Sequence, residues 1–225
     1  MKKISTLFVI NRETGHATIA VNDENIWVLD GEGAATVKFD GTAIAFINGR
    51  WYKRFDRKLN KQAQRRYNKW KSGYIRHPFV PTDDEFKVLP EGAIPTQPDP
   101  DPMTFHHPHW VPAPLDAPDN KHLAEAVMAM VAESHVPVEG ATYELIGPAV
   151  QRNPYGLSHH RLIRHGTELV EDLNTPTRNF HQIKSWLKNN QCEGVVFHHP
   201  DGRMVKIRRK DMGFNWNTSA DPRNQ

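Results

Sequence analysis

Short stretches that mix apolar and polar residues fill the first fifty positions of the chain. β-Branched and aromatic side chains recur in them, and Asn, Asp and Gly residues stand between them. This pattern predicts strands over residues 5–10, 18–21, 26–29, 35–39 and 42–47. The pair Asn48-Gly49, inside "FINGRWY", predicts a two-residue hairpin turn after the last of these strands.

Helical and hairpin patterns alternate in the second half. Apolar residues recur with a helical period in 120–135 and again in "NFHQIKSWLKNNQ", where Ile183, Trp186 and Leu187 should face the core. "ATYELIGPAV" and "HHRLIRHG" each predict a strand, and "EGVVFHHPDGRMVKIRR" predicts a hairpin with a Pro-Asp-Gly turn. We therefore expect an α+β fold of mainly antiparallel sheets flanked by a few helices.

The middle of the chain follows neither pattern. Residues 76–118 are rich in proline, which removes backbone donors and blocks helix formation, although a short strand can fit near "HWVPAP". We expect a single domain over residues 1–216 that contains an irregular basic and proline-rich insertion at about 56–118. The polar residues 217–225 should form a loose tail.

Charge is distributed unevenly along the chain. The formal net charge is +3, yet residues 50–71 contain ten Lys/Arg and one Asp, a local balance of +9 that leaves −6 for the remainder. Aromatic residues interleave with this charge: Trp51, Tyr52, Phe55, Tyr67 and Trp70. Cations and exposed rings suit phosphates and unstacked bases, so we predict nucleic-acid contacts by Arg65, Arg66 and Lys69, with Tyr67 and Trp70 guiding the end of a strand. The alternative is a solvated amphipathic segment.

Cysteine content and apolar runs bear on the compartment. Cys192 is the only cysteine, so an intrachain disulfide is impossible. The apolar run near the N-terminus ends at Asn11 and Arg12, too early for a signal peptide, and no run of about twenty apolar residues follows. We expect a protein of the cytoplasm or another reducing intracellular compartment, without a membrane partner.

A lysine interrupts the strand pattern in "ATVKFDGTAIAF". Strand interiors seldom place a lysine between apolar neighbours, so Lys38 is either a solvated charge before a turn or a nucleophile held in a pocket. The period of two puts Lys38 and Asp40 on one face of their strand. It likewise puts Lys206 and Arg208 on one face of a later strand.

Several short motifs follow Lys38 in order. They are "KFDG", Lys53-Arg54, "YELIGP", "EGVVF" and "KIR". Together they resemble the covalent nucleotidyltransferase superfamily of ligases and capping enzymes. "ELIGPAVQRNPYG" looks like the RNA ligases, and "EGVVFHHPDGRMVKIRRKDMGF" is similar to a compact branch of ATP-dependent 5′–3′ RNA ligases. The resemblance covers about residues 5–216 and implies a nucleotidyltransferase (ATP-grasp-like adenylation) fold.

The resemblance also implies a reaction. Lys38 would take AMP from ATP as a lysyl-AMP, pass it to an RNA 5′-phosphate, and a 3′-hydroxyl would then displace it. Glu193 and Glu144 would hold Mg²⁺, with Mn²⁺ as an alternative, since hard cations prefer oxygen ligands. Glu144 would also contact the ribose.

Further residues would bind the nucleotide. Lys206 and Arg208 would favour the neutral amine by repulsion and neutralise phosphate charge. Arg54 would bind the 5′-phosphate or the AMP phosphate. Backbone groups near Thr36 and Val37 would read the adenine edge, and Asp40 would complete the nucleotide site.

Two departures from the superfamily pattern separate the alternatives. An aromatic ring usually covers the purine from the strand after the third motif, where this chain offers Leu162, Ile163 or His165. DNA ligases and capping enzymes add an oligonucleotide-binding barrel after the fifth motif, but only 17 residues follow Arg208. An RNA ligase is thus favoured over a DNA or DNA/RNA nick ligase of the same fold, and over a non-catalytic RNA-binding protein.

Histidine pairs raise the question of zinc. "FHHPHW", His159-His160 and His198-His199 place histidines side by side. Cysteine partners and a second half with metal-ligand spacing are missing from the sequence, so solvated or phosphate-contacting histidines are favoured.

Overall fold

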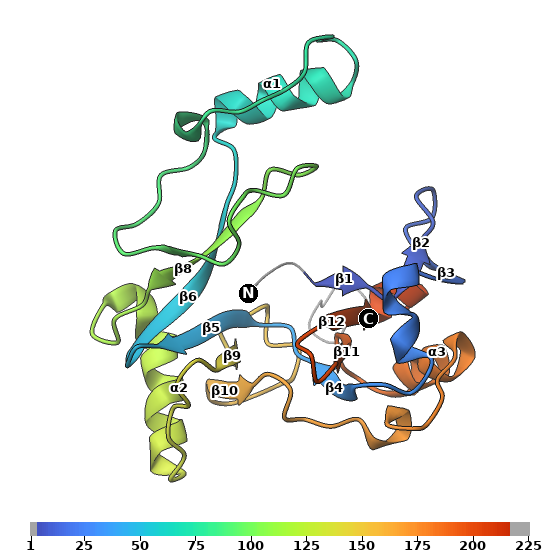
Figure 1. Cartoon of the computed structure of the whole chain (residues 1–225). Helices are drawn as coiled ribbons and strands as arrows, with labels where there is room; N and C mark the ends of the chain where they lie inside the picture. Colours follow the sequence, from blue (N-terminus) through green and yellow to red (C-terminus); the bar gives the residue numbers. More distant parts are fainter. Residues whose placement is uncertain (1–3, 217–225) are drawn as a thin grey trace, which may run out of the picture.

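The structure of the chain, a computed structural model, describes residues 4–216 (Figure 1). The predicted tail at 217–225 lies outside the described residues. The strands are β1 (Ser5–Thr6), β2 (Phe8–Ile10), β3 (Ala17–Val21), β4 (Ala34–Lys38), β5 (Thr42–Ile47), β6 (Arg50–Arg57), β7 (Ile94–Pro95), β8 (His107–Pro112), β9 (Thr142–Ile146), β10 (Arg161–Arg164), β11 (Gly194–His198) and β12 (Met204–Arg208). The α-helices are α1 (Lys61–Lys71), α2 (Lys121–Ala132) and α3 (Phe180–Asn189). Short 3-10 helices cover Asp23–Val28, Asp83–Glu85, Pro118–Asn120, Glu171–Leu173 and Arg209–Met212.

Two sheets organise these elements. A four-stranded sheet has the order β1-β12-β11-β4, and a six-stranded sheet has the order β10-β9-β5-β6-β8-β7. Neighbouring strands are antiparallel, apart from the parallel pair of β1 and β12. At the β5–β6 hairpin, Asn48 and Gly49 have φ values of 50° and 70°, the left-handed conformation that this turn requires. The α+β prediction with mainly antiparallel sheets is confirmed.

Each sheet buries one face against a helix. Ile183 and Leu187 of α3 are fully buried in the same core as Val195 and Phe197 of β11, and the predicted stripe is confirmed. On the six-stranded sheet, α2 packs through Leu123, Ala126 and Val127 against Tyr143 and Leu145 of β9. Because strand side chains alternate, the residues between these core positions point to the other face of each sheet.

The insertion between β6 and β8 is more regular than expected. Figure 1 shows α1 at the far end of an arm that β6 and β8 extend from the sheet. The arm has its own hydrophobic cluster, which contains Leu59, Ala63, Tyr67, Phe79 and Phe86. The prediction of an irregular insertion is therefore wrong for α1, while the strand expected near "HWVPAP" is confirmed as β8. Residues 50–71 contain ten Lys and Arg residues, and the few apolar positions of α1 among them were too sparse to indicate a helix.

One predicted strand is also wrong. Residues 26–29 do not form a strand, since Asp23–Val28 is a 3-10 helix whose Trp27 and Val28 are buried. A short apolar run of this kind does not distinguish a buried turn of helix from a strand. None of the helices between residues 4 and 216 has both the length and the apolar character that a membrane crossing requires.

Candidate active site

A cavity of about 320 Å³ lies between the two sheets. One wall comes from β4, β11 and β12, and the other from β8, β9 and the residues after β10. The lining residues include Thr36, Val37, Lys38, Trp110, Thr142, Glu144, His165, Val196, His198 and Met204. Residues of three of the motifs, "KFDG", "YELIGP" and "EGVVF", thus meet at one place, although up to about 160 residues separate them along the chain.

Strand register places the cations of this wall in rows. Lys38 pairs with Gly194 of β11, which pairs in turn with Arg208 of β12. Two residues along each strand, Thr36 pairs with Val196, and Val196 pairs with Lys206. Directly paired residues share a face of the sheet, so the shared face predicted for Lys206 and Arg208 is confirmed, and Lys38 lies on it too.

Gly194 lies between Lys38 and Arg208 in the first of these rows and brings no side chain to it. A Cβ atom there would come within 2.8 Å of the Arg208 Cα and would lie closer still to the Ile207 carbonyl oxygen. The pairing of β11 with β12 therefore requires glycine at this position, and Lys38 and Arg208 flank a position without a side chain.

The Lys38 amine forms an ion pair with the carboxylate of Glu193, the residue that precedes β11. The two side chains are 23% and 15% exposed, so the pair is largely withdrawn from water. Burial raises the pKa of Glu193; Lys38 opposes this shift, and the charges of Asp40 and Glu144 add to it. Lys38 is therefore a paired charge inside the cleft and not a solvated charge at the edge of the sheet.

Lys206 stands in the adjacent row of the same face. Its pKa is lowered to about 8, first by burial and then by the positive charges of Lys38 and Arg208. Positive charge is thus crowded on this wall of the cleft, where the phosphates of a nucleotide would relieve the repulsion.

Arg208 has a partner that the sequence analysis missed. Its Nε and Nη2 atoms donate to the two carboxylate oxygens of Asp211 at 2.9 and 2.7 Å, and Asp211 is buried. This bidentate bond raises the pKa of Arg208 and offsets its charge. Arg208 is therefore a fixed element of the wall, and Lys206 is the more available cation. The spacing of three residues in "RRKD" was the signal that could have identified Asp211.

Glu144 projects from the opposite wall and is held by a histidine. The His165 Nε2 atom lies 2.8 Å from the Glu144 carboxylate, and its Nδ1 atom lies 2.9 Å from the Thr142 hydroxyl. Of the three residues considered for covering a base, His165 lines the cavity, whereas Leu162 packs beside the α2 core. The carboxylates of Glu193 and Glu144 are oxygen donors from the two walls, the type of ligand that fits Mg²⁺.

Asp40 is fixed by residues far along the chain. Its backbone N–H donates to the Tyr155 hydroxyl at 2.6 Å, and its carboxylate accepts a bond from Trp216 Nε1 at 2.8 Å. The Tyr155 and Trp216 rings also contact each other. The sequence analysis identified Asp40 and missed both of these partners, although Tyr155 lies within the stretch "ELIGPAVQRNPYG".

The backbone near Thr36 and Val37, where the sequence analysis expects adenine contacts, is partly engaged within the protein. The Val37 N–H already donates to the Glu168 carbonyl at 2.8 Å. The Thr36 hydroxyl and the His198 ring, 3.0 Å apart, are the polar groups that these strands present to the cavity. Burial lowers the pKa of His198, so its ring is neutral near pH 7.

Arg54 belongs to the cavity side of the six-stranded sheet. On β6 it pairs with Trp110 of β8, which lines the cavity, so both side chains lie on the same face. Its neighbour Lys53 points to the other face and donates to Asn120 Oδ1 at 3.0 Å. The structure thus separates the two cations of the Lys53-Arg54 pair.

The RNA-binding residues predicted on α1 lie on the arm. Arg66 pairs with Glu85 at 2.6 Å and stacks over the Phe79 ring, and Lys69 lies over the Tyr74 ring. The expectation of exposed rings is wrong for Trp51, Tyr52 and Tyr67, which are buried. Tyr67 belongs to the core of the arm, and its hydroxyl donates to the Met103 carbonyl. Arg65, Arg66 and Lys69 are all exposed, and Arg66 shares its charge with Glu85.

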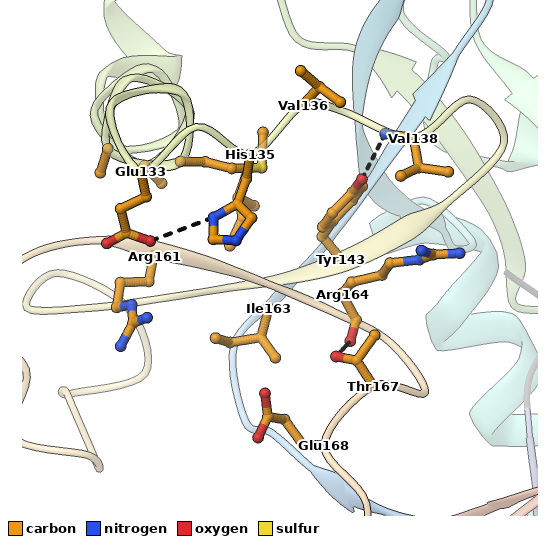
Figure 2. Close-up of a pocket in the computed structure, with 14 residues that line it drawn as sticks. Glu133, His135, Val136, Val138, Tyr143, Arg161, Ile163, Arg164, Thr167 and Glu168 are labelled. Carbon is orange, nitrogen blue, oxygen red and sulfur yellow. Dashed lines mark hydrogen bonds and ion pairs between the residues drawn. The ribbon is translucent and has the colours of Figure 1, made fainter.

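A second cavity, of about 340 Å³, lies between the end of α2 and β10 (Figure 2). The Tyr143 hydroxyl accepts a bond from the Val138 N–H, and Thr167 donates to the Arg164 carbonyl within the wall that Figure 2 shows. Leu162 and Ile163, two of the three residues considered for covering a base, line this cavity, whereas the predicted nucleophile and its carboxylate and cationic partners do not. The candidate active site is therefore the cleft between the sheets.

Replacing Lys206 with methionine should stabilise the protein. Lys206→Met removes a partly buried cation from beside two others, so we expect the free energy of unfolding to rise by about 1–2 kcal/mol near neutral pH. The lysine pKa is about 8 in the folded protein and 10.5 ordinarily, so the unaltered protein gains stability as pH rises through that interval. The difference in free energy of unfolding between the variant and the unaltered protein should therefore shrink as pH rises. Urea denaturation at several pH values would measure this difference. A stability deficit at neutral pH would contradict this account.

Known proteins are similar in sequence to this chain over most of its length. The family described as RNA ligase 1 matches residues 121–224. RNA ligase 1 of Danio rerio is 31% identical over 230 residues, which cover 81% of this chain and 68% of that protein. RNA ligase 1 of Mus musculus is 31% identical over 223 residues, with 81% and 67% covered. The region that the family matches includes Glu144, Glu193 and Lys206.

Proposed function

The chain belongs to the RNA ligase 1 family, and on this basis we propose that it is an ATP-dependent RNA ligase that joins a 5′-phosphate to a 3′-hydroxyl through a lysyl-AMP on Lys38. The family confirms the resemblance to RNA ligases that the ordered motifs suggested. The observation that carries the mechanism is the position of Lys38, paired with Glu193 and beside Lys206, in a cavity with Glu144 on its opposite wall.

The first step joins AMP to the protein. Lys38 gives a proton to Glu193, the base that it already contacts, and burial makes Glu193 a better proton acceptor because it disfavours the carboxylate. The neutral amine attacks the α-phosphorus of ATP. A nitrogen–phosphorus bond forms, the bond to the bridging oxygen breaks, and pyrophosphate leaves with that electron pair.

The cationic wall stabilises this transfer. Lys206 neutralises charge that develops on the phosphates, and Asp211 holds Arg208 in place beside them. Mg²⁺, or Mn²⁺ in its place, bound by Glu193 and Glu144 would neutralise further phosphate charge. His165 holds Glu144 toward the ribose, and the neutral His198 ring with the Thr36 hydroxyl provides a polar edge for adenine.

The two later steps transfer AMP to the RNA and then join the two RNA ends. An oxygen of the RNA 5′-phosphate attacks the phosphorus of lysyl-AMP, and the nitrogen–phosphorus bond breaks to return the Lys38 amine. A 3′-hydroxyl then loses its proton and attacks the 5′-phosphorus of the adenylylated RNA, and AMP leaves. Arg54, which lies on the same sheet face as the cavity-lining Trp110, would hold the 5′-phosphate.

The same proposal covers the type of fold and the boundaries of the domain. Two antiparallel sheets with a nucleotide cleft between them support a nucleotidyltransferase fold, with residues 1–216 as one adenylation domain. The arm at about 56–118 is then an insertion that leaves and re-enters beside the cleft.

Intact-mass measurement after incubation with Mg²⁺ and either ATP or GTP tests the proposal. We expect one AMP added per chain with ATP and little addition with GTP. Stronger labelling by GTP would turn the assignment toward capping chemistry. Joining assays with single-stranded RNA, nicked RNA and nicked DNA would then separate RNA ligation from a nick ligase of the same fold.

The arm should affect joining more than adenylylation. Changing Arg65, Arg66 and Lys69 to alanine should leave lysine labelling nearly intact, because α1 lies outside the cleft. It should weaken RNA binding and reduce the slope of log affinity against log salt by about 0.7 for each phosphate of a single strand that the variant no longer binds. Filter binding and joining rates at several salt concentrations would measure both effects.

A matched variant controls for charge in that experiment. Replacing Arg12, Lys121 and Lys188 with alanine removes the same charge from exposed positions outside the arm and the cleft. It should leave RNA affinity and its salt slope close to those of the unaltered protein. Equal losses in the two triple variants would show that general charge, and not the arm, attracts the RNA.

A further inference from the structure

Three side chains outside the nucleotide cleft come together near the start of α2. His122 and Glu125 are three residues apart on this helix and therefore share one face. His160, just before β10, places its Nδ1 atom 2.7 Å from the Glu125 carboxylate. The ring centroids of His122 and His160 are 4.3 Å apart, and one ligand atom from each of the three residues lies within 4.8 Å of the others.

The surroundings of these groups suit metal coordination. Burial and the neighbouring His160 lower the pKa of His122, so its imidazole keeps a lone pair near neutral pH. The Glu125 pKa is also lowered, first by its bond with His160, so this group is a carboxylate. Two neutral imidazoles and a carboxylate are a known donor set for zinc with water as the fourth ligand.

The distances require a modest adjustment. Zinc–ligand bonds of about 2.0–2.1 Å put tetrahedral ligand atoms about 3.3 Å apart. The His160 Nδ1 atom and the Glu125 carboxylate lie 2.7 Å apart, so the exposed Glu125 side chain must draw back slightly, and the partly exposed His122 side chain can turn toward them. His160 is 4% exposed, and its ring is packed against Gly147, where a Cβ would come within 2.5 Å. One ligand is thus rigidly placed, and the other two can close on an ion.

We propose that His122, Glu125 and His160 bind one divalent transition-metal ion, with zinc favoured by the donor set. The ion takes the place of the proton between His160 Nδ1 and Glu125, and binding weakens at low pH because protons compete with the metal for the same ligand atoms. The proton of His160 then lies on Nε2, and the long 3.3 Å bond from the Ala149 N–H is given up. The bound ion ties α2 to the segment that enters β10, two parts of the chain that lie 35 residues apart.

Metal titration of a chain that cannot form lysyl-AMP tests this site apart from the proposed ligase reaction. Full-length protein carrying Lys38→Ala would be titrated with Co²⁺, whose visible absorption reports coordination, and then with Zn²⁺ in competition. We expect one Co²⁺ per chain, a four- or five-coordinate spectrum, and displacement by Zn²⁺. Zn²⁺ should also raise the Tm, since it binds the folded protein.

Substitutions at the two accessible ligands connect the signal to the site. In the Lys38→Ala background, His122→Asn and Glu125→Gln should each weaken binding at least tenfold, about the loss that follows from disturbing a metal site. His135→Asn makes the same change at an exposed histidine beyond the end of α2 and should leave affinity unchanged. Unchanged affinity and an unchanged Zn²⁺-dependent Tm rise in both ligand variants would overturn the proposal.

Discussion

Replacing Lys38 with alanine should abolish labelling by ATP, lowering its rate at least about a thousandfold, because the amine forms the bond to the α-phosphorus. Radiolabelled ATP and intact mass would both measure the loss. Lys188→Ala, at an exposed position of α3, is the matched control and should label normally. Joining of an RNA that is already adenylylated at its 5′ end does not need the amine, so this step should survive in Lys38→Ala.

Protein stability must be separated from chemistry in this experiment. Lys38→Ala leaves the largely buried Glu193 without its cation, and burial already raises the pKa of this carboxyl. Loss of the Lys38 cation should raise the Glu193 pKa further and make its protonation easier, which limits the cost of the missing partner. Lys38→Arg keeps a cation beside Glu193 and lacks the nucleophilic amine, so it should fold and remain unlabelled. Labelling of both variants would place the nucleophile at another residue.

Replacing Glu193 with glutamine should slow lysine adenylylation by about 10²–10³-fold, because it removes the proton acceptor of Lys38 and a ligand for Mg²⁺. Glutamine has nearly the same shape, so the packing around β11 should persist. Without this base the remaining rate should depend more steeply on pH and recover in part at alkaline pH, where hydroxide takes the proton. Single-turnover labelling across a pH series would measure the effect.

An exposed glutamate provides the control for Glu193. Glu171→Gln makes the same change in the 3-10 helix Glu171–Leu173, at a position exposed to solvent. Its labelling rate and pH profile should match those of the unaltered protein. If Glu193→Gln labels at the normal rate with an unchanged pH profile, Glu193 neither accepts the proton nor assists the metal, and Lys38 is activated by other groups.

Local pattern was sufficient for most elements of this fold. The turn at Asn48-Gly49 depends on two adjacent residues that tolerate positive φ, and the stripe of Ile183 and Leu187 depends on the period of one helix. The common face of Lys206 and Arg208 depends on the period of one strand. Each of these features is set by residues within about one or two turns of each other, so a single sequence contains the information.

The sequence by itself determined which residues are candidates for the chemistry, and only the tertiary structure decided which of them meet. Lys38 and Glu193 are 155 residues apart, and pairing of β4 with β11 brings them together. The pairing of His165 with Glu144 and of Tyr155 with Asp40 could not be assigned from the sequence, because a contact between distant segments leaves no period in the local sequence. The same reason hid the cluster of His122 and His160, whose spacing has meaning only after α2 packs beside β10. Burial of apolar surface drives the folding that brings such distant positions together. Local sequence patterns do not show which distant segments become neighbours.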